Sequence, residues 1–425
     1  MAWTDKYLVL GGSAGDGSIS TPWGTFAEAL AEIGAITAPT RVYVQGNETL
    51  GANINWNVSG ANATPLTFVG CDSSWNVIGN NASATKPTLT CGAYLFDITG
   101  SYITLDNIAF TSSHTTAGGT MDVGAAYVTF KRCRFTATGA NANSVAMRIG
   151  TASGTSLFGC YLNATTTATA ALNITDANGC IIYGGVIEGG VSGIVSSSGS
   201  GCFAHNIIHS MGTGSGIVLS YSGNIAGSVI NNTIIGHATA DDGITLSGAI
   251  PRYNVINNLI VGFSQAGSYP IYFSNATAPS AGIAAFNAWH NCANNSIGGA
   301  VETQASHAGE SLDFANNVWN YGLLAADPLP NAATLGDAAD FTLASSAKAL
   351  AFPGIFEAGA YAYQGYLDHG AIQRPEDYPA VEDVESGVTY GGLGATAGSK
   401  ALTGTLAAGG GGGAPVFGGN MVRRV

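Results

Sequence analysis

Charged side chains are scarce in this chain of 425 residues. Only 9% of the residues are Asp, Glu, Lys or Arg, where about 25% is usual for globular proteins. Lys and Arg number 13 against 26 Asp and Glu, which gives a formal net charge of −13. Binding to the phosphates of nucleic acids requires clustered Lys and Arg. We therefore expect no nucleic-acid partner.

The sequence also lacks the patterns of membrane insertion and metal binding. No stretch is apolar enough to span a bilayer, and the first ten residues show no Sec-type signal pattern. The seven cysteines are odd in number and form no Cys-x-x-Cys pair, which argues against a zinc site and a complete disulfide framework. We expect buried free thiols, no metal, no cofactor and no membrane insertion.

Glycine is abundant, with 61 positions, and Ser, Thr and Asn supply most of the polar surface. Together with Val and Ile, these residues favour short strands joined by tight turns. They do not favour long helices covered with charged pairs. The composition therefore indicates an all-β protein.

A five-residue unit that ends in an apolar side chain recurs along the chain. The shortest step between copies runs from Ile187 to Ile208, and the longest runs from Trp289 to Trp319. A second apolar series keeps the same step. The units end at Phe110, Phe135, Leu162, Ile187, Ile208, Ile234, Ile260, Trp289 and Trp319, and the second series is Met147, Leu172, Ile194, Ile217, Ile244 and Ile271.

The third position of the unit is asparagine in its last five copies, and cysteine in two earlier ones, Cys133 and Cys160. Three short strands in each repeat of about 25 residues predict a solenoid, whose parallel coils lie about 4.8 Å apart. An inward asparagine at a bend then bonds to its equivalent one coil away and satisfies turn backbone groups. We expect this structural ladder to comprise Asn206, Asn232, Asn258, Asn287 and Asn317.

This pattern resembles the right-handed parallel β-helix (pectate-lyase-like) superfamily, which includes pectate lyases, polygalacturonases and phage tailspikes. The resemblance covers residues 8 to 375. It implies three short strands per coil and a short N-terminal capping helix, for which Phe26, Ala29, Leu30 and Ile33 form the apolar face. The predicted divisions are an entry strand and capping helix at 1–40, the β-helix at 41–375, and a Gly-rich tail at 376–425.

The tail lacks the alternation of the coils and includes a glycine run from Gly409 to Gly413. Two interpretations are open. It is either a flexible linker and peptide, or a small strand-forming module that orders only against another subunit.

Candidate catalytic residues are few. Asp241 and Asp242 precede a predicted strand much as an acidic pair does in polygalacturonase-like enzymes, and Glu188 is the nearest further acid along the coils. An Asp-Asp-Gly turn is also an ordinary entry to a strand. His205 and His209 do not have the spacing of a metal pair on a strand. Lys131, Arg132 and Arg134 form a basic trio that we interpret as a solvated outer face without neighbouring acids.

Three functions follow from the resemblance and from the lack of a catalytic cluster. The leading hypothesis is a structural or receptor- and glycan-binding virion protein, such as a tailspike, fibre or capsid-decorating subunit, that forms a homotrimer or binds other virion subunits. The second is a polysaccharide lyase or glycoside hydrolase that uses Asp241 and Asp242 on the β-helix face. The third is a bacterial adhesin at the cell surface or outside the cell. The balance favours a protein without enzymatic activity, located in a virion.

Overall fold

The computed structural model describes residues 3–34, 36–78, 85–116, 118–197, 200–221, 226–247, 252–274, 281–285, 287–294 and 297–299, and the strand residues 389–390 and 402–403. The ranges up to residue 299 contain the coils. The predicted boundary at residue 375 and the fifth ladder residue, Asn317, lie outside the described residues. Within the tail, β31 (Thr389–Tyr390) pairs antiparallel with β32 (Leu402–Thr403).

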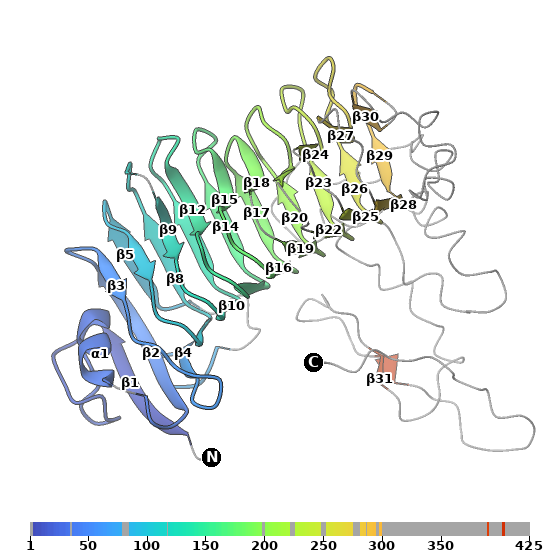
Figure 1. Cartoon of the computed structure of the whole chain (residues 1–425). Coiled ribbons are helices and arrows are strands. Elements are labelled where there is room, and N and C mark those ends of the chain that lie inside the picture. The colour runs from blue at the N-terminus through green and yellow to red at the C-terminus, as the bar shows by residue number, and fades with distance from the viewer. Residues whose placement is uncertain are drawn as a thin grey trace, which may run out of the picture.

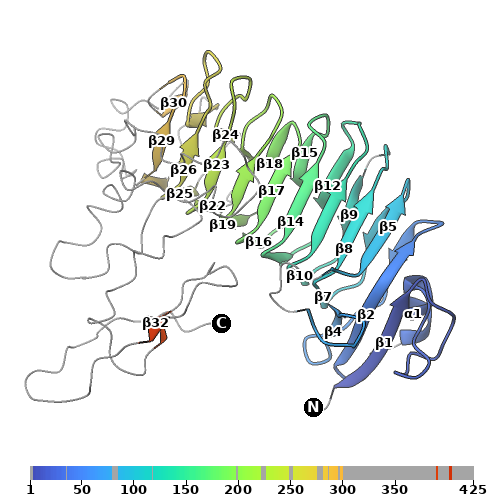
Figure 2. The ribbon, with the colours of Figure 1, turned by 180° about the vertical axis from the view of Figure 1, so that it is seen from behind.

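The coils stack into three parallel sheets, which we name A, B and C, and the rows of strands run along the whole stack in Figures 1 and 2. The long strand β2 (Thr40–Thr49) pairs in sheet A through its first half and in sheet B through its second.

Sheet A also contains β1 (Thr4–Leu10), β4 (Leu66–Gly70), β7 (Ile103–Asp106), β10 (Val128–Lys131), β13 (Ser156–Phe158), β16 (Cys180–Tyr183), β19 (Gly201–Ala204), β22 (Ala226–Ile230), β25 (Arg252–Ile256) and β28 (Ala281–Ala285). Sheet B also contains β5 (Thr88–Gly92), β8 (Ala109–Ser112), β11 (Arg134–Ala137), β14 (Tyr161–Ala164), β17 (Val186–Gly189), β20 (Ile207–His209), β23 (Thr233–Ile235), β26 (Leu259–Val261) and β29 (Ala288–His290). Sheet C contains β3 (Ile54–Trp56), β6 (Phe96–Ile98), β9 (Gly118–Val123), β12 (Ser144–Ile149), β15 (Ala170–Ile174), β18 (Ser192–Ser196), β21 (Ile217–Ser220), β24 (Ile244–Ser247), β27 (Ile271–Phe273) and β30 (Gly298–Gly299).

Equivalent residues of successive coils lie beside one another. In sheet C, Met147 pairs with Leu172, Leu172 with Ile194, and the series continues through Ile217 and Ile244. These are the residues of the second apolar series, and they form one continuous core with the inward residues of sheets A and B. The all-β parallel β-helix with three short strands per coil is therefore confirmed.

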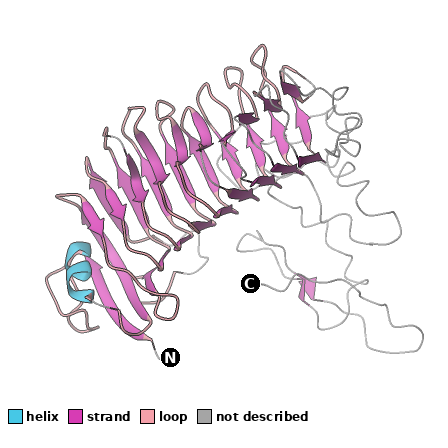
Figure 3. Ribbon diagram, in the orientation of Figure 1, coloured by secondary structure: helices cyan, strands magenta, loops and turns pink. Residues whose placement is uncertain are grey.

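One helix covers the N-terminal end of the stack, and Figure 3 shows it as the cyan element. Helix α1 (Phe26–Ile33) begins after Thr25, whose side chain accepts a hydrogen bond from the Glu28 N–H as an N-cap. Phe26 is fully buried, with its ring 5.4 Å from Trp56 and 5.1 Å from Phe68. The capping helix predicted from its apolar face thus closes the core of the first coil.

The bend between sheets A and B holds a column of asparagine side chains. Nδ2 of Asn206 donates to Oδ1 of Asn232 at 3.0 Å. Asn232 donates in the same way to Asn258, at 3.0 Å, and Asn258 to Asn287, at 2.9 Å. The same Oδ1 atoms accept the backbone N–H of the preceding asparagine, at 2.9 to 3.0 Å. The asparagines therefore replace, at the bend, the strand hydrogen bonds that the backbone cannot make there.

The column changes chemistry toward the N-terminus. Gly185 occupies the ladder position before Asn206 and donates its N–H to the Asn206 Oδ1 at 3.0 Å. A Cβ at this glycine would lie 2.7 Å from the carbonyl oxygen of Cys160. Cys160 and Cys133 continue the column as buried free thiols, and burial raises the pKa of both. The column is thus polar in the later coils and sulfur-lined in the earlier ones.

Replacing a ladder residue should destabilise the protein strongly. In Asn232→Ala the buried N–H groups of Asn206 lose their acceptor, which costs about 3 kcal/mol in the free energy of unfolding. Denaturant unfolding followed by circular dichroism measures this loss. The matched control is Asn254→Ala, which removes an outward-facing amide on β25 and should cost less than about 1 kcal/mol. Equal losses in the two variants would show that the column contributes nothing specific.

Candidate functional site

The outer face of sheet C carries a row of polar side chains at its N-terminal end. Each side chain stands between two inward apolar residues, as Asp97 does between Phe96 and Ile98. The strand register places them side by side on successive coils. We call this set the sheet C polar row, and it comprises Asn55, Asp97, Asp122, Arg148 and Asn173.

The centre of the row is an ion pair between adjacent strands. The Arg148 Nε donates to Oδ1 of Asp122 at 3.0 Å, and Nη2 donates to Oδ2, so the contact is bidentate. The hydrogen bonds from Arg148 to Asp122 raise the pKa of the arginine further. The guanidinium is therefore fixed in place as a permanent cation, about a third exposed to solvent.

Asp97 lies on the other side of Asp122 from Arg148. Burial raises the pKa of Asp97, the negative charge of Asp122 raises it further, and Arg148 acts in the opposite direction. Its Oδ1 atom is buried and has no hydrogen-bond partner within the described part of the chain. A buried carboxylate oxygen without a donor is costly. The Asp97 side chain as a whole is only half-buried, so its carboxylate has acceptor capacity left for a bound hydroxyl group.

The amides at the two ends of the row extend this chemistry. Asn55 is exposed, and its Oδ1 accepts from the Thr99 hydroxyl at 3.0 Å. Asn173 is half-buried beside Arg148. Outward side chains become apolar at Val195, the next position in the register. The row thus presents amide, carboxylate and guanidinium groups, which are the usual donors and acceptors for sugar hydroxyls.

The two acids proposed from the sequence differ in their surroundings. Asp242 is buried, and its carboxylate accepts from the Tyr269 N–H at 2.7 Å and from the Thr245 hydroxyl at 3.2 Å. Burial raises the pKa of Asp242 to about 6. Asp241 is exposed. Asp242 therefore links its own coil to the next one through the Tyr269 N–H, as an acid at a turn does. Asp241 is exposed to solvent.

Other residues weighed in the sequence lie on sheet B or at the bend. Glu188 accepts a hydrogen bond from the Tyr161 hydroxyl. His209 is buried beside it, and burial lowers the pKa of that histidine. His205 adopts a positive φ of 57° at the bend and lies against the ring of Tyr183, 5.0 Å away.

One interpretation of the basic trio was wrong. Lys131, Arg132 and Arg134 do face outward, but Arg132 has an acid beside it. Its guanidinium binds both carboxylate oxygens of Asp106 on the preceding coil. The sequence hid this contact because Asp106 and Arg132 are 26 positions apart.

The described residues hold no candidate metal site and no membrane-spanning helix. No group of three or more His, Cys, Asp or Glu side chains within the described ranges is placed to hold a metal ion. Within the same ranges, no helix has the length and apolar character needed to cross a membrane.

Known protein structures share the fold of this chain, whereas known sequences do not match it. No protein-family model matches the chain, and no curated protein matches its sequence. Its structure is similar to that of the pectate lyase Pel9A, with a TM-score of 0.55 and 15% identity over 87% of this chain and 96% of that one. A rhamnogalacturonan lyase matches with a TM-score of 0.41 and 14% identity over 68% of this chain and 74% of that one. The chain therefore has a parallel β-helix fold similar to that of this pectate lyase, as the sequence resemblance predicted.

The buried acid Asp242 makes stability depend on pH. Its folded-state pKa of about 6 lies above the ordinary value of 3.8, so the folded state binds this proton more tightly than the unfolded chain does. The contribution is fully present below pH 3.8 and is lost as the pH rises through 6. We expect the gain in unfolding free energy between pH 7 and pH 5 to shrink in Asp242→Asn. Asp241→Asn, measured by the same urea titrations, should keep most of the gain, because burial is the largest cause of the raised pKa of Asp242 and the charge of Asp241 is a smaller one. An unchanged gain in Asp242→Asn would contradict the assignment.

Proposed function

We propose that this protein binds a glycan on the outer face of sheet C. The observation that carries the proposal is the sheet C polar row, with a pre-oriented cation, a carboxylate oxygen without a donor and flanking amides on adjacent coils. Such groups on a rigid scaffold recognise hydroxyl-rich ligands without having to be ordered on binding.

The dimensions of the row support an extended ligand. Its five side chains lie on successive parallel coils. At a strand spacing of about 4.8 Å, such a row spans about four spacings, or roughly 19 Å. One spacing is close to the length of one sugar ring, so neighbouring coils can each contact a neighbouring sugar. An oligosaccharide that lies along the stack would meet all five side chains.

The ion pair favours binding over elimination chemistry. A base in a lyase must accept a proton, and Arg148 instead donates to both oxygens of Asp122, which raises its pKa. A guanidinium held in this way serves as a hydrogen-bond donor and a positive charge.

A polysaccharide lyase or hydrolase is the second candidate, and one observation favours it. The raised pKa of Asp97 arises beside a second carboxylate, and a raised pKa is typical of carboxyl groups that act as general acids. For this candidate we propose Asp97 as the acid. Asp242 also has a raised pKa, but it is buried and already accepts hydrogen bonds from Tyr269 and Thr245.

The location of the protein and its assembly into a trimer remain predictions. A virion subunit of the tailspike, fibre or decoration type, assembled as a homotrimer, would use a glycan-binding face to contact a receptor. An adhesin at a bacterial surface would use it in the same way. Light scattering of the full chain tests the trimer.

Removing the Asp97 acceptor should weaken glycan binding. We expect a screen of neutral and acidic oligosaccharides to yield a ligand, and Asp97→Ala to raise its Kd about tenfold or more, because a hydrogen bond to a charged group is lost. Thr136→Ala, an outward side chain on sheet B, is the matched control and should leave the Kd unchanged. A ligand that both variants bind as tightly as the parent does would place the site elsewhere.

Incubation with the same oligosaccharides distinguishes a binding protein from an enzyme that cleaves them. The proposal predicts that each oligosaccharide is recovered intact after long incubation, as judged by mass spectrometry. Shortened products that disappear in Asp97→Asn would instead establish the enzyme.

A further inference from the structure

The corner between sheets A and B carries a concentration of positive charge in a chain that is otherwise acidic. Four of the 13 Lys and Arg side chains lie there, on neighbouring coils. Asp106 binds one of them, Arg132, which leaves a local excess of positive charge. We call this set the basic corner, and it comprises Lys86, Lys131, Arg132 and Arg134.

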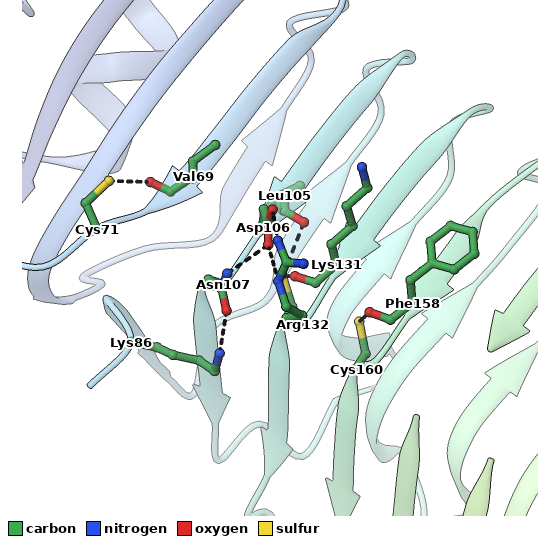
Figure 4. Close-up of polar contacts among 11 residues, drawn as sticks. Val69, Cys71, Lys86, Leu105, Asp106, Asn107, Lys131, Arg132, Phe158 and Cys160 are labelled. Atoms are coloured by element: carbon green, nitrogen blue, oxygen red, sulfur yellow. Dashed lines mark hydrogen bonds and ion pairs between the residues drawn. The ribbon is translucent and has the colours of Figure 1, made fainter. Parts of the chain in front are cut away.

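The contacts around Asp106 fix two of the cations, as Figure 4 shows. Asp106 holds the Arg132 guanidinium by two hydrogen bonds and also accepts from the Asn107 amide at 3.0 Å. The Lys86 ammonium donates to the Asn107 Oδ1 at 2.8 Å. Burial and the charge of Arg132 lower the pKa of Lys86. Lys86 thus binds the Asn107 amide, Arg132 binds the Asp106 carboxylate, and the hydrogen bond from Asn107 to Asp106 links the two contacts.

The other two cations stand at the rim. Lys131 is exposed at the end of β10, in register with Asp106, and its side chain points away from the cluster in Figure 4. Arg134 is exposed at the start of β11, with its guanidinium 4.8 Å from the centre of the Tyr161 ring. An anion at this corner would therefore contact two cations that are held in place, Lys86 and Arg132. The exposed side chains of Lys131 and Arg134 could move to contact it as well.

The backbone at Arg132 is a second, independent observation. Arg132 has a φ of 53°, in the left-handed region. The equivalent bend positions hold asparagine, glycine or histidine, at Asn107, Gly159, Gly184, His205, Asn231 and Asn257. A long side chain there costs free energy that asparagine or glycine would not. An arginine at this position is strained, and its charge offers a reason for the strain.

We propose that the basic corner binds an acidic group, a carboxylate or a sulfate, of an anionic glycan. Paired guanidinium and ammonium donors are the usual partners of such oxyanions. The corner extends over three coils, or about two strand spacings, which matches one or two anionic groups and not the long phosphate track of a nucleic acid. The inference rests on the proposed function only in taking the ligand to be a glycan, because the corner and the sheet C polar row lie on different faces of the coil.

Arg132→Asn is the informative variant. It removes the charge and installs a residue that the same bend accepts at Asn231 and Asn257, both with φ of 54°. The fold should therefore be retained, and a thermal unfolding curve checks this. Lys6→Gln is the matched control, since it makes the same change in net charge in the first coil, at a site that is half-buried as Arg132 is.

The measurement is calorimetric binding of the full chain to oligogalacturonate, to a sulfated oligosaccharide, to neutral dextran and to a DNA duplex. We expect one of the two acidic glycans to bind, with a Kd about tenfold higher in Arg132→Asn and unchanged in Lys6→Gln. Which of the two binds distinguishes a carboxylate from a sulfate site. Equal losses in both variants, equally tight binding of DNA, or no binding of either acidic glycan would overturn the proposal.

Asp97→Ala, measured in the same series, separates this inference from the proposed function. Acidic-glycan binding that Asp97→Ala retains and Arg132→Asn loses supports the basic corner, whatever the outcome at sheet C. Loss in Asp97→Ala with full binding in Arg132→Asn would support sheet C and overturn the basic corner.

Discussion

The stacking of equivalent residues in successive coils is the constraint on which the rest of this structure depends. Strand hydrogen bonds hold the register along each sheet, but they are interrupted where the chain bends from sheet A to sheet B. In the later coils, asparagine amides bridge that gap: each Oδ1 atom accepts the backbone N–H of the preceding coil. Because the amides are buried, an asparagine out of register would leave donors and acceptors unpaired, so the ladder penalises any slip of one coil against the next.

The same register determines which polar side chains lie next to each other on the outer surface. A solenoid has no cleft formed by separate lobes, so groups that act together must come from neighbouring coils. Asp97, Asp122 and Arg148 are brought together on sheet C in this way, and Asp106 and Arg132 at the bend. Both ion pairs join residues 26 positions apart, which is one coil. The two pairs give the coils two polar surfaces on different faces, one with a buried carboxylate beside it and one with an excess of cations.

The fold could be predicted from the sequence because inward residues repeat their chemistry. The asparagines and the apolar series from Met147 to Ile271 recur at nearly constant steps, and the structure places them in register. The polar row was missed for a physical reason. Outward positions tolerate any polar residue, so the motifs Phe-Asp-Ile, Met-Asp-Val and Met-Arg-Ile each suggest only a strand with a solvated face. Their adjacency depends on loop lengths, and the step from Asn55 to Asp97 is much longer than the usual coil. Lys86, likewise, binds Asn107 from a position just before β5 that belongs to no repeat in the sequence.

Distances between spin labels on the outer face of sheet A test the in-register stack most directly. Labels at residues 129 and 228 are four coils apart, and labels at residues 104 and 254 are six coils apart, by the strand register. With about 4.8 Å per coil, the pairs should lie about 19 Å and about 29 Å apart. Distances by electron paramagnetic resonance that grow by about 10 Å between the two pairs would agree with the stack. Equal distances, or a shorter distance for the pair with more intervening coils, would contradict it.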